Sequence, residues 1–307
     1  MAAFTAKDVA ELRKQTGCGM MDCKNALVEA NGDVEAAVKI LREKGMAATA
    51  KKQDRIAAEG LVDILTCGNK TAMIEVNSET DFVAKNETFK VFVRDILQTI
   101  LDSGVSTIEE LLQAKYLGGE QTVEQVLQDK TYTIGEKLSI RRFIVVDGVV
   151  STYIHGMGQT GVIIAFDTDV ADNAEFADFA KNIALQAAAY SAPYLSRETV
   201  PASVIEEEKN ILLKQMEQDP KMAGKPEKVL QGIVTGRLGK FFEANCLLEQ
   251  GYVKDDSLTV QKYVDQTAKA FGGKIVVTGC YRFDKGEGIQ KREDDLAAEV
   301  AKMVGGK

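Results

Sequence analysis

The sequence is poor in the residues that most catalytic and metal centres require. Its 307 residues contain one histidine, His155, so a multi-histidine metal centre is excluded and any Ser-His-Asp or Cys-His mechanism would depend on that residue. The cysteines number five, which is odd, and no two of them form a C-x-x-C motif. Neither a disulfide framework nor a zinc site is therefore indicated, and a reducing cytoplasm is the expected setting.

Long apolar runs and an excess of positive charge are also absent. No run of about 18 apolar residues occurs, so no membrane span is expected, and residues 1–8 lack the basic and apolar regions of a signal peptide. The net charge of −8 argues against a protein that coats nucleic acid. The motif G-x-x-x-x-G-K-[ST] is missing, which argues against nucleotide hydrolysis by the chain itself. The composition, 45% apolar and 27% charged, predicts a globular protein long enough for two or three domains.

Residues 1–45 carry the start and stop signals of three short helices. Thr5 followed by Asp8 matches a capping box, and Gly17 stops the first helix. The Asn-Gly-Asp run at 31–33 closes the second helix and caps the third, which Gly45 ends. We expect these helices to form a small partner-binding domain, followed by a flexible tether over residues 46–56.

The chain then changes to predicted strands followed by an amphipathic helix. The strands flank a glycine-bearing turn at 67–70, and shorter helices opened by Thr107 and Thr122 are expected after the long one. The apolar face of the long helix comprises Phe89, Phe92, Val93, Ile96, Leu97, Ile100 and Leu101.

A second set of elements repeats this order. Predicted strands cover 143–146, 149–154 and 162–166, and a helix from Phe176 repeats the pattern F-x-x-F-small-basic-Asp/Asn-Ile of the helix from Phe89. A helix opened by Ser257 and a returning strand at 275–283 complete the set. The fold class predicted is α+β, with two similar core subdomains of antiparallel sheet plus helix, over residues 57–140 and over 141–200 with 251–284.

Residues 201–250 predict a helical hairpin of coiled-coil type. Its turn spans 219–226, with a glycine that ends one helix and a proline that starts the next. The apolar faces exceed what two arms need to pair, so we expect a further contact, either within the chain or with a second copy in a homodimer. Residues 285–307 predict a C-terminal module, a glycine-rich turn with a short helix at 296–304.

Two motifs have competing interpretations. Residues 156–161 fit G-x-G-x-x-G, but an apolar strand follows where a dinucleotide site needs a helix, so a flexible hairpin turn is favoured and His155 beside it is expected to be a solvated loop residue. Met20 and Met21 either fill the small helical core or form an adaptable contact surface.

Asp81 and Phe82 form the third such motif, at a polar turn between a strand and the long helix. In one interpretation Asp81 caps the helix and Phe82 packs into the core. In the other the pair is held outward for a partner.

Four ordered motifs resemble the bacterial elongation factor Ts family. They are T-G-C-G-M-M-D-C-K at 16–24, A-N-G-D at 30–33, E-V-N-S-E-T-D-F-V-A-K-N at 75–86 and R-F-x-K-G-E-G-I at 282–289. The resemblance covers nearly the whole chain. It implies a ubiquitin-associated-like three-helix domain, two similar α+β subdomains, an inserted coiled-coil hairpin and a C-terminal helical module.

The resemblance also implies a function and a set of contact residues. Members exchange guanine nucleotide on elongation factor Tu during translation elongation, by binding rather than by bond chemistry and without a cofactor or metal of their own. The resemblance places Thr80, Asp81, Phe82 and Val83 near the magnesium site of elongation factor Tu with GDP. It places Met20 and Met21 on a helix of the nucleotide domain and His155 against another domain of the partner.

Two other functions remain as alternatives. A nucleotide-cofactor enzyme that uses the 156–161 glycines predicts a helix after Gly161. A ubiquitin-like-binding adaptor predicts that the first 45 residues act alone, independently of Asp81 and Phe82.

Overall fold

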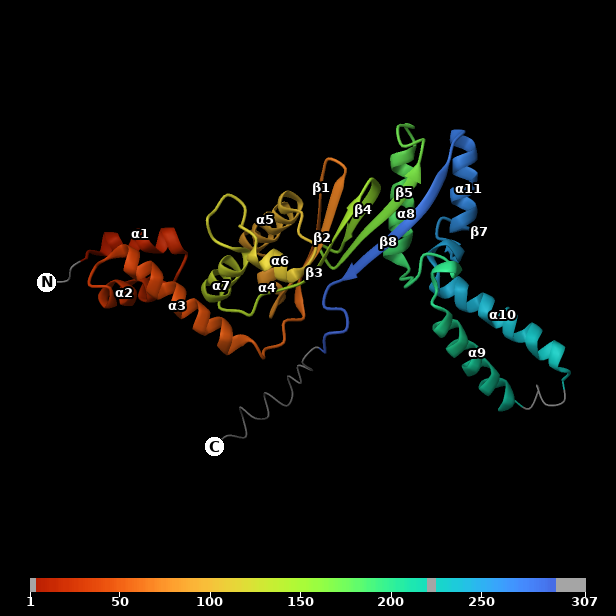
Figure 1. The fold of residues 1–307 in the computed structure, drawn as a ribbon, viewed down its shortest axis with the longest axis horizontal. Helices are drawn as coiled ribbons and strands as arrows, with labels where there is room; N and C mark the ends of the chain where they lie inside the picture. The colour runs from red at the N-terminus through yellow and green to blue at the C-terminus, as the bar shows by residue number, and fades with distance from the viewer. Residues whose placement is uncertain (1–3, 220–224, 291–307) are drawn as a thin grey trace. The chain divides into compact units, whose positions relative to one another are not determined.

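The computed structural model describes residues 4–219 and 225–290, which combine helices with antiparallel sheet, as an α+β fold requires (Figure 1). The described residues form two compact units. The first contains residues 4–65, 72–145 and 284–290, and the second contains residues 66–71 and 146–283. The hairpin turn predicted at 219–226 lies partly outside the described residues. The C-terminal helix predicted at 296–304 lies entirely outside them.

Three helices begin the first unit: α1 (Ala6–Thr16), α2 (Met20–Glu29) and α3 (Val34–Lys52). The predicted caps are present, since Thr5 and Asp8 form a capping box and the side chain of Asp33 accepts a hydrogen bond from the Ala36 amide. Gly17 ends α1 in the left-handed conformation. The core between the helices comprises Val9, Leu12, Cys18, Cys23, Ala26, Leu27, Ala37 and Leu41.

The prediction that Gly45 ends the third helix is wrong. Helix α3 continues to Lys52 and packs along α7 (Val123–Ile134), where Tyr132 contacts the core of the first three helices. Gly45 faces Tyr132 and Asp129, and Lys52 Nζ donates a hydrogen bond of 3.1 Å to the Thr131 carbonyl. The helix cost of glycine, about 1 kcal/mol, is offset by this packing. The link between α3 and the next strand is therefore only residues 53–58.

The first sheet has the order β1-β2-β3, with β1 at Glu59–Cys67, β2 at Lys70–Ser78 and β3 at Ser139–Asp147. The central strand β2 is buried along nearly its whole length. The strand predicted at 143–146 is part of β3 and pairs in this sheet, so its expected place in the second set of elements is wrong. The domain boundary predicted between residues 140 and 141 falls inside β3. The rest of the predicted division into domains stays a prediction.

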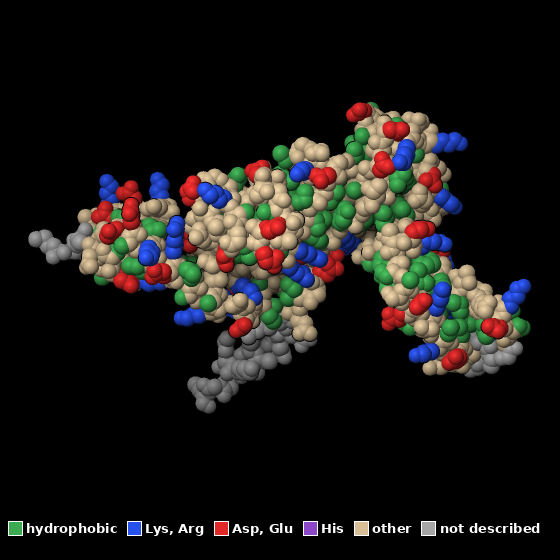
Figure 2. All heavy atoms as spheres, in the orientation of Figure 1, with side chains coloured by type: hydrophobic (Ala, Val, Ile, Leu, Met, Phe, Trp, Pro, Cys, Tyr) green, Lys and Arg blue, Asp and Glu red, His purple; other side chains and the backbone are tan. Residues whose placement is uncertain are grey.

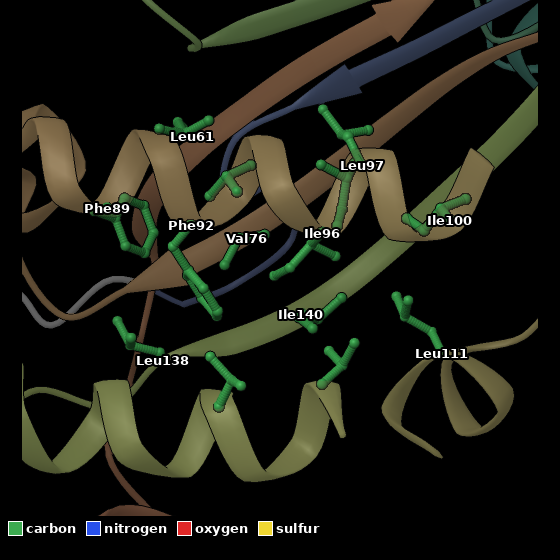
Figure 3. Packing of buried hydrophobic residues seen from close by; sticks show 14 of the residues in the cluster. Leu61, Val76, Phe89, Phe92, Ile96, Leu97, Ile100, Leu111, Leu138 and Ile140 are labelled. Atoms are coloured by element: carbon green, nitrogen blue, oxygen red, sulfur yellow. The ribbon is translucent and has the colours of Figure 1, made fainter. Parts of the chain in front are cut away.

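Helix α5 (Glu87–Ser103) presents its predicted apolar face to this sheet (Figure 3). The first unit also contains the short helices α4 (Asp81–Lys85) and α6 (Ile108–Gln113) and helix α7. Thr107 and Thr122 open α6 and α7, as predicted, and each forms a capping box. The core members labelled in Figure 3 are Leu61, Val76, Phe89, Phe92, Ile96, Leu97, Ile100, Leu111, Leu138 and Ile140.

The second unit contains a sheet of order β4-β5-β8, with β4 at Val149–His155, β5 at Thr160–Thr168 and β8 at Ile275–Asp284. Strands β4 and β5 are antiparallel, in a register that pairs Val149 with Phe166 and His155 with Thr160. Helix α8 (Phe176–Ala189) buries Phe176 and Phe179 in the core of this unit, as α5 does with Phe89 and Phe92 in the first. The returning strand predicted at 275–283 is confirmed as β8.

Helix α11 (Val260–Phe271) also covers this core, and it begins after Thr259 rather than at the predicted Ser257, which lies in β7 (Asp255–Thr259). Strand β7 pairs with β6 (Gly251–Tyr252). Two arms, α9 (Ala202–Glu217) and α10 (Glu227–Asn245), run side by side as the predicted helical hairpin (Figure 1). Short 3-10 turns at Arg197–Thr199 and Leu247–Glu249 flank the hairpin.

None of the helices in the described ranges is long and apolar enough to cross a membrane. On the face visible in Figure 2, acidic and basic side chains are interspersed over both units. That face lacks the continuous basic stripe by which nucleic-acid-binding surfaces are recognised.

Candidate partner-binding site

Residues 78–85, which we call the Phe82 loop, join β2 to α5 and present an exposed aromatic ring. The loop contains the end of β2 and the single short helix α4, none of whose residues is buried. The Phe82 side chain is 80% exposed, the largest such fraction among the exposed phenylalanines and tyrosines of the described chain. The ring of Phe82 therefore presents apolar surface to water that the fold of this chain does not bury.

The interpretation that Asp81 caps the helix and Phe82 packs into the core is wrong. Thr80 occupies the N-cap of α4 and Asp81 is the first helical residue. The core below is filled by other side chains, chiefly those of α5, and only Val83 of the loop packs against it. Phe82 is therefore free to meet a partner without loss of core packing.

The carboxylate of Asp81 pairs with Lys85, one helical turn along α4. Lys85 Nζ lies 2.5 Å from Asp81 Oδ2, and both side chains are about half exposed. The hydrogen bond from Lys85 is the main cause that lowers the pKa of Asp81 below its ordinary value. Asp81 is thus an anion directly beside the exposed ring.

The backbone before Asp81 is anchored by groups from another part of the first unit. The amide and the hydroxyl of Thr80 donate to the two carboxylate oxygens of Glu136, at 3.0 and 2.6 Å. Glu79 accepts a bond of 2.5 Å from the Lys137 amide and pairs with Arg55. Sequence reasoning missed Glu136, because it lies 56 residues from Thr80 and no local signal marks the contact.

The R-F-x-K-G-E-G-I motif is held beside β2 by the buried carboxylate of Glu75. Burial by itself raises the pKa of Glu75, but hydrogen bonds from the Gly286 amide, Asn77, Arg141 and Arg142 outweigh it and hold the pKa below its ordinary value. Further polar contacts of the motif include an ion pair of Lys285 with Glu59 and an ion pair of Glu287 with Arg142. The motif at 75–86 and residues 284–289 of the second motif, which lie far apart in the sequence, therefore meet in the first unit.

Met20 and Met21 lie at the start of α2, exposed by 44% and 61% respectively. The core of the three helices is filled instead by neighbours such as Cys18, Cys23 and Leu27. The core-filling interpretation is therefore wrong for both methionines, and their flexible thioethers are available on the surface.

His155 is exposed, as expected, but it is the last residue of β4 in the second unit, paired with Thr160, rather than a loop residue. The Tyr153 hydroxyl lies 3.1 Å from His155 Nδ1. In the turn that follows, Met157 is 85% exposed and has a positive φ of 56°, a feature that sequence reasoning missed. Strand β5 begins at Thr160, so the helix that a dinucleotide site would need after Gly161 is not present.

The candidate residues are distributed over both units. Thr80 to Val83, Met20 and Met21 belong to the first unit, and His155 to the second. Across residues 4–219 and 225–290, no group of three or more His, Cys, Asp or Glu side chains is arranged to hold a metal ion. The exposed candidate residues Phe82, Met20, Met21 and His155 are available for contact with a partner.

Comparisons with known proteins point to one family. A family model described as Elongation factor TS matches residues 79–287. The chain is 45% identical to elongation factor Ts of Syntrophotalea carbinolica over 305 residues, which cover 98% of this chain and 99% of the relative. It is 46% identical to elongation factor Ts of Clostridioides difficile over 308 residues (99% and 100%), and 43% identical to that of Magnetococcus marinus over 307 residues (99% and 100%). The chain therefore belongs to the elongation factor Ts family of translation elongation factors.

Proposed function

We propose that this chain is a guanine nucleotide exchange factor for elongation factor Tu. It promotes release of GDP by disturbing the magnesium and phosphate site of that partner during translation elongation, in the cytoplasm. The observation that carries the proposal is the Phe82 ring, 80% exposed on a loop whose backbone is anchored. Membership of the elongation factor Ts family supports it.

Exchange of this kind needs no bond chemistry from the chain. A protein that binds best to a distorted nucleotide site must weaken GDP by the same factor by which GDP weakens its own binding. In this proposal Phe82 inserts its ring among the groups that hold the magnesium ion, and the Asp81 carboxylate adds negative charge beside it. Thr80 and Val83 flank the pair and complete the contact.

Further contacts hold the partner while its nucleotide site is disturbed. We assign these to Met20 and Met21 on α2 and to His155 at the end of β4, all of them exposed. Methionine suits such a surface because its unbranched side chain adapts to the opposing groups. These contacts contribute affinity for the partner in every nucleotide state, whereas Phe82 acts on one state only.

The decisive experiment measures release of fluorescent GDP from elongation factor Tu at increasing concentrations of the chain. The wild-type chain should accelerate release, and Phe82→Ala should lower the maximal rate at least about tenfold, the effect of one lost apolar side-chain contact. The matched control is Val91→Ala, which removes an exposed apolar side chain from α5 in the same unit. A wild-type chain without effect on release, or equal rates for the two variants, would refute the proposal.

The α9–α10 hairpin is accessory in this proposal, and its further contact is a second copy of the chain. Ile211, Leu213 and Val229 on its arms are exposed by 43–46%. Sedimentation of the full chain and of a variant with three serines at these positions tests this contact. A wild-type chain that is monomeric at every concentration would contradict the dimer, and loss of all binding to elongation factor Tu in the variant would contradict the accessory role.

A further inference from the structure

Glu136 directs both of its carboxylate oxygens to one residue of the Phe82 loop. Helix α7 ends at Ile134, and Gly135 caps it with a positive φ of 86°, so that the chain turns and Glu136 comes next. Glu136 Oε2 accepts from the Thr80 amide at 3.0 Å, and Oε1 accepts from the Thr80 hydroxyl at 2.6 Å. Bonds to an ionised acceptor are short and about twice as strong as neutral ones.

The hydroxyl of Thr80 does not make the contact that is usual for an N-cap residue. A threonine at an N-cap usually accepts a hydrogen bond from a helix amide through its hydroxyl oxygen. Thr80 makes no such bond to α4, and its hydroxyl instead donates to Glu136. The backbone and side chain of Thr80 are thus both committed to the residues that follow α7.

Apolar packing contributes little to the position of the loop. Helix α4 has five residues, none of them buried, and only Val83 packs on the core. Polar contacts join the loop to the residues after α7 instead, since Glu79 accepts from the Lys137 amide in addition to the bonds of Thr80 to Glu136. Within the loop, the Ser78 hydroxyl donates to the Thr80 carbonyl. The conformation that exposes Phe82 therefore depends on the hydrogen bonds between residues 136–137 and residues 79–80.

We propose that Glu136 is a positioning residue for nucleotide exchange, which holds Thr80 so that the following Asp81 and Phe82 are presented in one orientation. The inference rests on the proposed function and adds a residue that acts through the loop. Without this restraint the loop must be ordered when Phe82 engages the partner, and that ordering lowers the gain from the contact. Because Met20, Met21 and His155 still hold the partner, the loss falls on the maximal rate of GDP release rather than on the concentration for half-maximal rate.

The test combines Glu136→Gln with two variants of its partner. Glutamine keeps the size of Glu136 but turns an NH2 group toward one of the two Thr80 donors. The maximal rate of GDP release should fall about tenfold, the value of one charge-assisted hydrogen bond, with the half-maximal concentration changed less than about twofold. Thr80→Val should have a similar effect, and Thr80→Ser, which keeps the hydroxyl that donates to Glu136, should lose less of the maximal rate than Thr80→Val.

Two further arms separate positioning from stability. If the residues act through each other, the double variant Thr80→Val with Glu136→Gln should lose no more than the worse single variant. Amide hydrogen exchange over residues 78–85 of the free chain should speed up in Glu136→Gln. It should not do so in Glu120→Gln, a control whose side chain is 93% exposed.

Specific results would overturn the inference. An unchanged maximal rate per folded molecule in Glu136→Gln would do so, as would a reduced rate with unchanged hydrogen exchange in the loop or additive losses in the double variant. If the wild-type chain does not accelerate GDP release, the proposed function falls and the exchange role of Glu136 falls with it. Hydrogen exchange then still decides whether Glu136 orders the loop, because that measurement needs no partner.

Discussion

Glu75 and Gly286 lie 211 residues apart in the chain, yet the Gly286 amide donates a hydrogen bond of 2.7 Å to Glu75 Oε1. Arg141 donates to the same oxygen at 3.0 Å, and Arg142 donates to Oε2 at 2.7 Å. The Glu75 side chain is fully buried, whereas the arginines are about one quarter exposed. One carboxylate therefore joins β2, β3 and the segment that follows β8.

The network around Glu75 should make stability depend on pH in the acid range. Since its folded-state pKa lies below the ordinary value, about 4.3 when unfolded, the network stabilises the fold fully above that value. This contribution is lost as the pH falls through the folded pKa. Glu75→Gln should therefore have a free energy of unfolding that changes less with acidification below about pH 5 than the wild-type chain. Urea unfolding at a series of pH values measures this, with Glu120→Gln as the control, and equal pH dependence in wild type and Glu75→Gln would contradict the prediction.

Gly286 and Gly288 offer a matched pair of substitutions. Both have positive φ, of 70° and 72°, but a Cβ at Gly286 would lie 2.3 Å from the Ala58 carbonyl oxygen, whereas a Cβ at Gly288 would meet nothing within 4 Å. Both alanine variants carry the cost of left-handed backbone, about 1–2 kcal/mol. Gly286→Ala should lose about 1–3 kcal/mol more, because the clash must be relieved by backbone shifts. Chemical denaturation gives the difference, and equal losses would show that this close approach does not matter.

Truncation to alanine should lower the free energy of unfolding strongly at Phe92 and hardly at all at Phe82. Phe92 is 1% exposed in the core of the first unit, and its change to alanine should cost about 3–5 kcal/mol of stability. Phe82→Ala should change the free energy of unfolding by less than about 0.5 kcal/mol, because an exposed side chain loses no packing. Thermal midpoints of the two variants, measured together with their GDP release rates, check this. A large drop in the midpoint of Phe82→Ala, with exchange per folded molecule unchanged, would sink the assignment of Phe82 as the exchange residue.

The continuous helix α3 predicts where the chain resists protease and how Gly45 responds to substitution. Limited proteolysis should cut within 53–58 and spare 46–52, which are helical. Gly45→Ala should stabilise the chain by up to about 1 kcal/mol, because its Cβ would lie at an ordinary contact distance of 3.6 Å from Tyr132 Cβ. Preferred cleavage at 46–52 would argue that α3 does not continue past Gly45 in solution. A lower thermal midpoint in Gly45→Ala would argue that the space beside Tyr132 does not admit a methyl group.

Much of the local structure could be predicted from short stretches of sequence. The caps at Thr5, Asp33, Thr107 and Thr122 each involve residues about three positions apart, so a few side chains specify them. The apolar face of α5 follows from helical spacing alone. At the site, the sequence allowed either a buried or an exposed Phe82. The structure shows the ring exposed because other side chains fill the core beneath it.

Other features were decided only by tertiary structure. The pattern at 143–146 indicates a strand but not its partner, because strand pairing depends on contacts distant in sequence, and β3 pairs in the first sheet. Gly45 is a helix stop by local rules, yet contact with α7 carries α3 beyond it. The sequence by itself thus determined the elements, their caps and the motifs that identify the family. Packing between distant segments determined which strands pair and which carboxylates, Glu75 and Glu136, hold those motifs in place, since hydrogen bonds across 56 or 211 residues leave no local pattern.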